Sequence, residues 1–305
     1  MKGRIFKSTG SLYQVKGVDD QFYSCRTRGK LRLEGYKESN PLAVGDWVEF
    51  DVDGNEGSIH VIHPRTNHVL RQSVKRTEHS SVLAANVDQA LVMATLSQPR
   101  TSTGFIDRFL VSCEAYRIPQ IILFNKSDLL DEEQLKEVKQ LMNLYAGVGV
   151  KSLLVSALRF TQKESVLNVM AGKTTLFAGH SGVGKSTLLN QLAPEINQPV
   201  GDVSAHTEKG IHTTTFAEMF QVSEHTFIID TPGIKEWGLV DMNQQEIADY
   251  LPEMRDLRLN CKYRSKCIHI NEPQCAIINA VNSGEIALSR YQNYLSMVTG
   301  QDTRR

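Results

Sequence analysis

The chain has 305 residues, of which 41% are hydrophobic and 22% are charged, a composition typical of a soluble globular protein with two or three domains. The 34 lysines and arginines balance the 34 aspartates and glutamates, which excludes a wholly basic nucleic-acid coat and an acidic disordered tail but leaves a local basic face open. Without a run of about 20 apolar residues or a signal-like N-terminus, we expect a cytoplasmic protein that contacts no membrane and keeps its five cysteines reduced.

Residues 1–70 predict a small all-β domain. Short runs rich in β-branched and aromatic residues alternate with frequent glycines, which is typical of a small barrel or sandwich. The expected strands contain Arg4–Phe6, Leu12–Val15, Gln21–Cys25 and Trp47–Phe50.

Residues 71–240 predict an α/β domain. Apolar runs that fit strands buried on both faces lie at Ala90–Ala94, Gln120–Phe124, Ser152–Val155, Thr174–Ala178 and Thr226–Ile229. Helical patterns between them cover Ile106–Tyr116, Glu132–Tyr145, Lys163–Met170 and Ser186–Leu192. Because strand alternates with helix, we expect a parallel sheet covered on both sides.

Residues 241–305 predict a mostly helical third domain. Helices are expected over Gln244–Leu251, Cys275–Asn282 and Gly284–Val298, with a cysteine-bearing loop after the first of them.

Gly179–Ser186 matches the phosphate-loop pattern GxxxxGK[ST], and it lies between a predicted strand and a predicted helix, as that motif requires. In such a loop, backbone N–H groups surround phosphate oxygens, Lys185 faces the outer phosphates, and the Ser186 hydroxyl binds Mg²⁺. The alternative is a glycine-rich turn with a chance lysine. The residues expected to contact nucleotide here are Gly179, His180, Ser181, Gly182, Val183, Gly184, Lys185, Ser186 and Thr187.

Asn125–Asp128, which we call the base loop, follows a predicted strand and resembles the NKxD motif of the GTPase superfamily. The carboxylate of Asp128 can accept from two N–H groups of guanine, a donor pair that adenine lacks. Lys126 can lie across the ring, and Asn125 can brace neighbouring loops. Alone, these four residues are more often a surface turn. Their combination with the phosphate loop favours base recognition.

Two later segments resemble the switches of GTPases. Asp230–Gly233 follows a predicted strand and resembles DxxG, in which Asp230 holds Mg²⁺ and the Gly233 N–H reaches the γ-phosphate. Gly210–Thr215 resembles switch I, and we expect Thr214 to complete the magnesium shell. The alternative for this threonine run is a plain loop of β-forming residues.

The order of these motifs indicates a circular permutation. An ordinary GTPase begins with the phosphate loop, whereas here the base loop comes first. It is followed by Ser156 and Ala157, which resemble the loop whose backbone N–H meets the guanine carbonyl. The phosphate loop and the switches come last. Switch II therefore leads directly into the C-terminal domain, so that movement of Gly233 can pull on the chain beyond residue 240.

Three cysteines and a histidine predict a metal centre near the C-terminus. Cys261, Cys267, His269 and Cys275 form a complete set for tetrahedral Zn²⁺. Because the residues between the ligands are polar, the loop has too little apolar area to fold by itself, and a bound structural ion would stabilise it. Four protein ligands leave no open coordination position on the ion for catalysis. The alternatives are disulfides or unrelated core cysteines.

The permuted motif order, the preceding β-rich region and the following Cys–Cys–His–Cys loop together resemble the family of ribosome small-subunit-dependent GTPase A (RsgA). Gly179–Ser186, His212–Thr215 and the Cys267–Cys275 segment are all close to the family pattern. One departure is the spacing between Cys261 and Cys267, which has five residues where the family usually has one fewer.

The resemblance implies an N-terminal OB-fold barrel that binds RNA, a permuted GTPase domain and a zinc domain. It further implies a monomer that binds GTP, GDP, the 30S subunit and its 16S rRNA, but not DNA. Nine basic residues against three acidic ones between Lys2 and Lys37 agree with RNA contact, although such an excess is usually a solvated face. Phe22 and Tyr23 either stack on bases or belong to the core. Lys262, Arg264 and Lys266 form a second candidate RNA surface.

The mechanism implied is GTP hydrolysis stimulated by the small subunit during late 30S maturation and coupled to release. Ile234 stands where classical GTPases carry a water-orienting glutamine. The resemblance points to His212 as its replacement, and the alternative is that His212 is an ordinary switch residue. One rival is a non-catalytic, GTP-sensing RNA-binding placeholder for assembly. Another is a GTPase that works on a different RNA or in envelope traffic.

Overall fold

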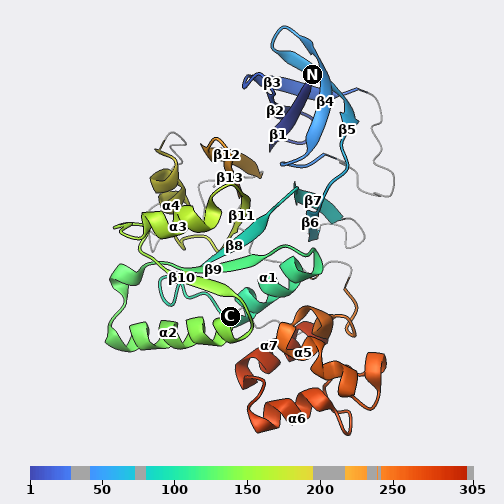
Figure 1. Cartoon of the computed structure of the whole chain (residues 1–305), viewed down its shortest axis with the longest axis vertical. Helices are drawn as coiled ribbons and strands as arrows, with labels where there is room; N and C mark the ends of the chain where they lie inside the picture. Colours follow the sequence, from blue (N-terminus) through green and yellow to red (C-terminus); the bar gives the residue numbers. More distant parts are fainter. Residues whose placement is uncertain (29–41, 73–79, 195–216, 232–238, 240–241, 301–305) are drawn as a thin grey trace, which may run out of the picture.

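The structure, a computed structural model, describes residues 1–28, 42–72, 80–194, 217–231, 239 and 242–300. These residues form a small barrel, a central sheet with helices on both faces, and a C-terminal group of short helices (Figure 1). The three predicted architectures, all-β, α/β and mostly helical, are confirmed. No helix in the described part of the chain is long and apolar enough to span a membrane.

The N-terminal strands close into a five-stranded barrel. The strands are β1 (Lys2–Ser8), β2 (Tyr13–Gly17), β3 (Phe22–Thr27), β4 (Trp47–Asp53) and β5 (Glu56–Ile62). They pair in the order β1-β2-β3-β5-β4, and β4 returns to β1. Alternate side chains such as Val15, Cys25 and Phe50 fill the interior, as the period of two in a strand requires. β5 was not predicted from the sequence, because Gly57, Ser58 and His60 interrupt the apolar pattern.

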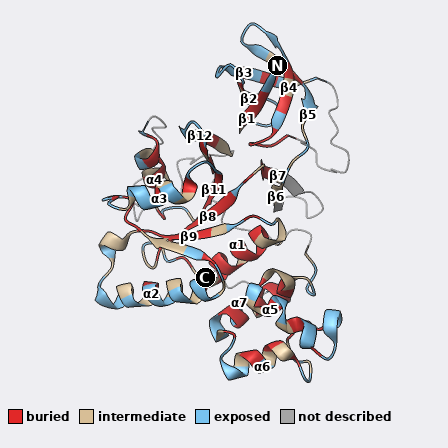
Figure 2. Cartoon of the chain, in the orientation of Figure 1, coloured by how far each residue is buried: buried red, intermediate tan, exposed pale blue. Residues whose placement is uncertain are grey.

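The central sheet has the order β10-β9-β8-β11-β13-β12, and only β12 runs antiparallel. Its strands are β8 (Gln89–Ala94), β9 (Gln120–Phe124), β10 (Lys151–Leu154), β11 (Thr174–Ala178), β12 (Glu218–Ser223) and β13 (Thr226–Asp230). β6 (His68–Gln72) and β7 (Ser80–Ala85) form a separate pair that connects barrel and sheet along the chain. Figure 2 shows that β8 and β11 are buried along their length, as their uninterrupted apolar runs predict.

Four helices cover the two faces of this sheet. α1 (Thr103–Ala115) and α2 (Glu132–Gly147) pack on one face, and α3 (Lys163–Met170) and α4 (Lys185–Leu192) on the other. The side chain of Ser102 caps α1, and Asp131 with Gln134 forms a reciprocal capping box at the start of α2.

The barrel is joined to the central sheet through β1. Lys7 of β1 pairs with Glu218 of β12, and their side chains form an ion pair of 2.9 Å. Three residues earlier in β1, Arg4 donates to the Thr174 hydroxyl at 3.0 Å and to the Asn86 carbonyl at 3.1 Å. Burial lowers the pKa of Arg4 to about 10, although Asp88 opposes the shift. All described strands except β6 and β7 therefore belong to one continuous eleven-stranded sheet.

The C-terminal region contains α5 (Pro252–Arg255), α6 (Ala276–Ser283), α7 (Leu288–Thr299) and short 3₁₀ turns. The helix expected over Gln244–Leu251 is wrong: the segment is a turn followed by a 3₁₀ helix, Ile247–Tyr250. Pro252 disfavours helical geometry at Leu251, which is extended. The helix expected from Gly284 begins only at Leu288, because Gly284 has a φ of +80° and ends α6.

Candidate functional site

The phosphate loop, residues 179–186, leaves the buried strand β11 and opens α4. Its glycines are required by geometry, because Gly179, Gly182 and Gly184 all have positive φ values. A Cβ at Gly184 would lie 2.4 Å from Asn125 Nδ2, and one at Gly179 would lie 2.7 Å from the Met93 carbonyl oxygen. Side chains at these two positions would push the loop away from the neighbouring strand ends.

Lys185 is folded over its own loop. Its Nζ donates to the carbonyl oxygens of Gly179 at 2.7 Å and His180 at 3.3 Å. Burial lowers the pKa of Lys185, while the nearby carboxylate of Asp230 opposes that shift. The ammonium is thus held at the mouth of the loop, where it can meet phosphate oxygens. Ser186 and Thr187 follow in the first turn of α4, both half-buried.

Asn125 connects three loops through one buried side chain. Its Nδ2 donates to the Val183 carbonyl in the phosphate loop at 2.8 Å. Its Oδ1 accepts from the Ala157 N–H at 2.8 Å, and its own N–H donates to the Ala94 carbonyl at the end of β8. The base loop, the Ser156–Ala157 loop and the phosphate loop therefore have fixed positions relative to one another.

The residues predicted to recognise the base lie beside this junction. Asp128 is half-buried, and its Oδ1 accepts from the Ser156 hydroxyl at 2.5 Å. Ser156 is itself held by the Arg159 N–H at 3.1 Å. Lys126, with a φ of +64°, donates from Nζ to the Gln98 carbonyl. The carboxylate and the ammonium thus emerge from one tight turn with restricted orientations.

Asp230 reaches the phosphate loop because β13 lies beside β11. Asp230 is buried at the end of β13 and pairs in register with Phe177, two residues before Gly179. The Thr231 hydroxyl fixes the exit of the strand by donating to the Phe177 carbonyl at 2.8 Å. The predicted switch residues His212, Thr214 and Gly233 lie outside the described residues.

The predicted metal ligands Cys261, Cys267, His269 and Cys275 converge. All four are buried, and their ligand atoms lie within 4.8 Å of one another. The Nδ1 of His269 lies 3.3 Å from Cys275 Sγ and 3.6 Å from Cys261 Sγ, and none of these cysteines is in a disulfide. Burial lowers the pKa of His269, which favours the neutral imidazole that binds metals. The cluster has the donors and the shape for one structural metal ion.

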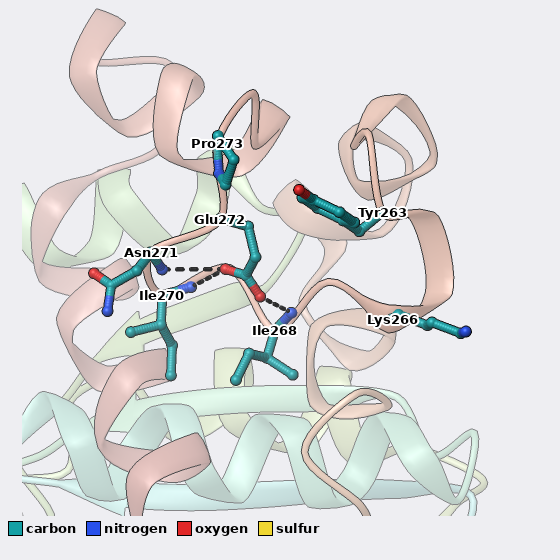
Figure 3. Close-up of a pocket in the computed structure, with 7 residues that line it drawn as sticks. All are labelled: Tyr263, Lys266, Ile268, Ile270, Asn271, Glu272 and Pro273. Atoms are coloured by element: carbon teal, nitrogen blue, oxygen red, sulfur yellow. Dashed lines mark hydrogen bonds between the residues drawn. The ribbon is translucent and has the colours of Figure 1, made fainter.

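Residues outside the cluster hold the metal loop, residues 261–275, in shape. Both carboxylate oxygens of Glu272 accept backbone N–H groups, from Ile268 at 2.7 Å, Ile270 at 2.8 Å and Asn271 at 3.1 Å (Figure 3). Tyr291 and Tyr294 of α7 donate to the carbonyls of His269 and Ile268. These bonds fix the backbone on both sides of the histidine ligand.

Some of these supports were missed by sequence reasoning. The hydrogen bond from Lys126 to the Gln98 backbone carbonyl could not be predicted from the sequence, because every residue has a carbonyl group. Tyr291 and Tyr294 were assigned only to a helix. Their spacing of three residues, which places both hydroxyls on one face, was the available signal.

Comparisons with known proteins agree with this geometry. The model of the family described as RsgA GTPase matches residues 62–240, and the RsgA N-terminal domain model matches residues 2–59. A protein of Christiangramia forsetii named small ribosomal subunit biogenesis GTPase RsgA is 46% identical, with 99% of this chain and 97% of the relative covered. A protein of Bacteroides fragilis with the same name is 45% identical over the same shares.

Two solved structures are similar over the full length of the chain. The crystal structure of YjeQ from Thermotoga maritima has a TM-score of 0.77 and 31% identity, with 100% of this chain and 99% of the other covered. The structure of YloQ, described as a circularly permuted GTPase, has a TM-score of 0.73 and 30% identity, with 100% and 96% covered. The rotated motif order therefore has a precedent in a solved fold of the same architecture.

Proposed function

This chain belongs to the RsgA family and is a GTP-hydrolysing enzyme, and from that premise we propose that it acts in late maturation of the 30S ribosomal subunit. It works in the cytoplasm as a monomer, binds 16S rRNA, and is stimulated by the small subunit, with hydrolysis coupled to release. The observation that carries the proposal is the Asn125 junction, which joins the base loop to the phosphate loop, as a site for GTP requires. The non-catalytic placeholder is set aside, because the family hydrolyses GTP.

For the chemistry, we propose that Asp128 reads guanine and that Lys185 neutralises the outer phosphates. Ser186, Thr214 and Asp230 would hold Mg²⁺, and hydroxyl and carboxylate oxygens are the ligands this hard cation prefers. When bound, the ion neutralises charge that develops between the β- and γ-phosphates. Gly233 would contact the γ-phosphate, and His212 would orient the attacking water in place of the missing glutamine.

We propose that the metal centre binds Zn²⁺. A tetrahedral zinc ion with Zn–S distances of about 2.3 Å places its sulfur ligands roughly 3.8 Å apart. Cys275 Sγ lies 3.8 Å from Cys261 Sγ and 3.8 Å from Cys267 Sγ, which supports this assignment. The ion would be structural, with all four positions filled by protein.

The barrel offers one surface for RNA. Trp47 is 38% exposed, and the Nζ of the exposed Lys2 lies 5.4 Å from its ring centroid. Phe22 is 51% exposed on β3, whereas Tyr23 belongs to the barrel core. Exposed aromatic rings beside cations are the parts that bind unpaired bases and their phosphates.

The metal loop offers a second surface. A pocket of about 520 Å³ is lined by Tyr263, Lys266, Ile268, Ile270, Asn271, Glu272 and Pro273. In Figure 3, Lys266 extends away from the other lining side chains. Tyr263 is 44% exposed, and Lys262 lies 5.8 Å from its ring centroid. The pocket combines apolar side chains with the Tyr263 ring, and the ammonium groups of Lys262 and Lys266 lie nearby. This combination suits an RNA base together with its phosphate.

The test of the proposal is GTP turnover with purified ribosomal subunits. Because no glutamine follows the DxxG motif, we expect slow phosphate release alone and an increase of about 10²-fold or more with 30S subunits. His212→Ala should remove that increase while GTP binding persists. Isolated 50S subunits are the control. A turnover rate that 30S subunits leave unchanged, or that 50S subunits raise equally, contradicts the proposal.

The second surface predicts a specific loss of subunit binding. Tyr263→Ala should weaken binding to 30S subunits by about tenfold, the scale of one lost base–aromatic stack. Tyr263→Phe should bind normally because the ring remains. Leu288→Ala, which removes a 59% exposed apolar side chain elsewhere in the C-terminal region, is the matched control. Equal binding of Tyr263→Ala and the wild type, measured by co-sedimentation, would exclude this surface.

A further inference from the structure

One face of α1 is occupied by the C-terminal region. Thr103, Asp107, Val111 and Glu114 follow one another at spacings of four, four and three residues, so they lie along one side of the helix. Asn293 contacts Thr103, Val111 belongs to the C-terminal apolar cluster, and Arg255 pairs with Glu114. Figure 1 shows α1 between the sheet and α7.

Asp107 is the centre of this interface. It is completely buried within α1 and accepts from Arg290 Nη1 at 2.5 Å, Asn293 Nδ2 at 2.6 Å and the Tyr145 hydroxyl at 2.9 Å. Arg290 also donates to both carboxylate oxygens of Glu253, at 2.7 and 3.1 Å. Removing Arg290 would leave a buried carboxylate without its counter-charge, so the helix that carries Asp107 would have to move or admit water.

The same turn of α1 contacts the phosphate loop on its other side. The ring centroids of Phe105 and His180 lie 3.9 Å apart, and Phe105 is buried. His180 is the second residue of the phosphate loop, and its carbonyl accepts from Lys185 Nζ. Phe105 and Asp107 are two residues apart, about 3 Å along the helix axis. Because both residues lie within one turn of α1, a shift of the helix at Asp107 would also move Phe105 against the His180 ring.

We propose that Phe105 is a positioning residue for the phosphate loop, and that Arg290 of the C-terminal region sets its position by fixing α1 at Asp107. The inference rests on the proposed nucleotide role of residues 179–186. It makes nucleotide affinity depend on α7, which supplies none of the proposed nucleotide contacts.

The test is the affinity for GDP, measured by fluorescence with N-methylanthraniloyl-GDP on the full chain. Arg290→Met should weaken binding by about fivefold, within the range found for residues coupled to a distant site. Arg255→Met is the matched control. It removes the same residue type from the same interface, at the Glu114 end of α1, roughly 13 Å from Phe105. It should change affinity by less than about twofold.

A double-mutant cycle separates positioning from general loosening. Phe105→Leu should weaken GDP binding by itself, and adding Arg290→Met should then cost less than about twofold more. The inference would be overturned if the effects of Phe105→Leu and Arg290→Met on GDP affinity multiply in the double variant. It would also be overturned if Arg290→Met alone leaves GDP affinity unchanged. Circular dichroism and metal content verify folding, and Arg290→Lys is the milder variant if Arg290→Met does not fold. Lys185→Ala separates failure of this inference from failure of the proposed nucleotide site, because normal GDP binding by that variant would refute the nucleotide site itself.

Discussion

Asp128→Asn is expected to lower GTP affinity by about 10²- to 10⁴-fold and to remove most of the preference for GTP over ATP. The substitution keeps the size of the side chain but replaces the anion proposed to accept two N–H groups of guanine with an amide that presents one acceptor and one donor. The hydrogen bond from Ser156 already orients this carboxylate, so the wild-type site loses little entropy when the base binds. Competition of GTP and ATP for the same site measures the change.

Ser156→Ala is the control for that experiment. It removes the hydroxyl that holds Asp128 but leaves the carboxylate, so we expect a loss of about fivefold with guanine preference retained. An Asp128→Asn variant that still prefers GTP to ATP as strongly as the wild type would disprove the base-recognition assignment.

Removal of the metal is expected to unfold the metal loop while nucleotide binding persists within about tenfold. Most residues between the ligands are polar, and Arg264, His269 and Gln274 have positive φ, so we expect the loop to depend on the ion for most of its folding free energy. Structural zinc in small domains contributes about 10–16 kcal/mol in apparent binding free energy, far more than the bonds from Glu272, Tyr291 and Tyr294 can replace. Limited proteolysis and GDP binding, measured after chelation, report the two properties separately.

Cys275→Ser should reproduce the effect of chelation, because it removes one of the four ligands. Cys113→Ala is the matched control: Cys113 is also buried, but in the core of the central domain, so the variant should keep one bound metal ion per chain. Simultaneous loss of GDP binding and of the loop after chelation would show that the two sites do not fold separately.

Local pattern was sufficient to predict the elements that surround the nucleotide site. β8, β9, β11 and β13 coincide with apolar runs, because a parallel strand buried on both faces needs no alternation, and the run at residues 152–155 also predicted the half-buried edge strand β10. α3 has its expected bounds. The metal ligands also converge as their spacing indicated.

Contacts between distant segments explain what the sequence did not reveal. The pairing of β1 with β12 joins Lys7 to Glu218 across more than two hundred residues, and no local pattern encodes it. In the sequence, Asp107 resembles an ordinary polar residue of an amphipathic helix. Its role as a buried partner of Arg290 is visible only in the structure, because Arg290 belongs to the C-terminal region. The helix expected over Gln244–Leu251 ignored Pro252, which disfavours helical geometry at Leu251, whereas the turn at residues 244–246 left no comparable signal in the sequence.

The attachment of the barrel has a practical consequence for fragments of this protein. In the intact chain, β1 pairs with the outer edge of β12, and Arg4 lies over the ring of Phe227. Deletion of residues 1–62 would remove both contacts. The edge of β12 would then be unpaired, and the nearby ring of Phe227 would be uncovered. An unpaired strand edge can pair with the same edge of another molecule. We therefore expect the shortened protein to self-associate and precipitate, even if its nucleotide site remains folded.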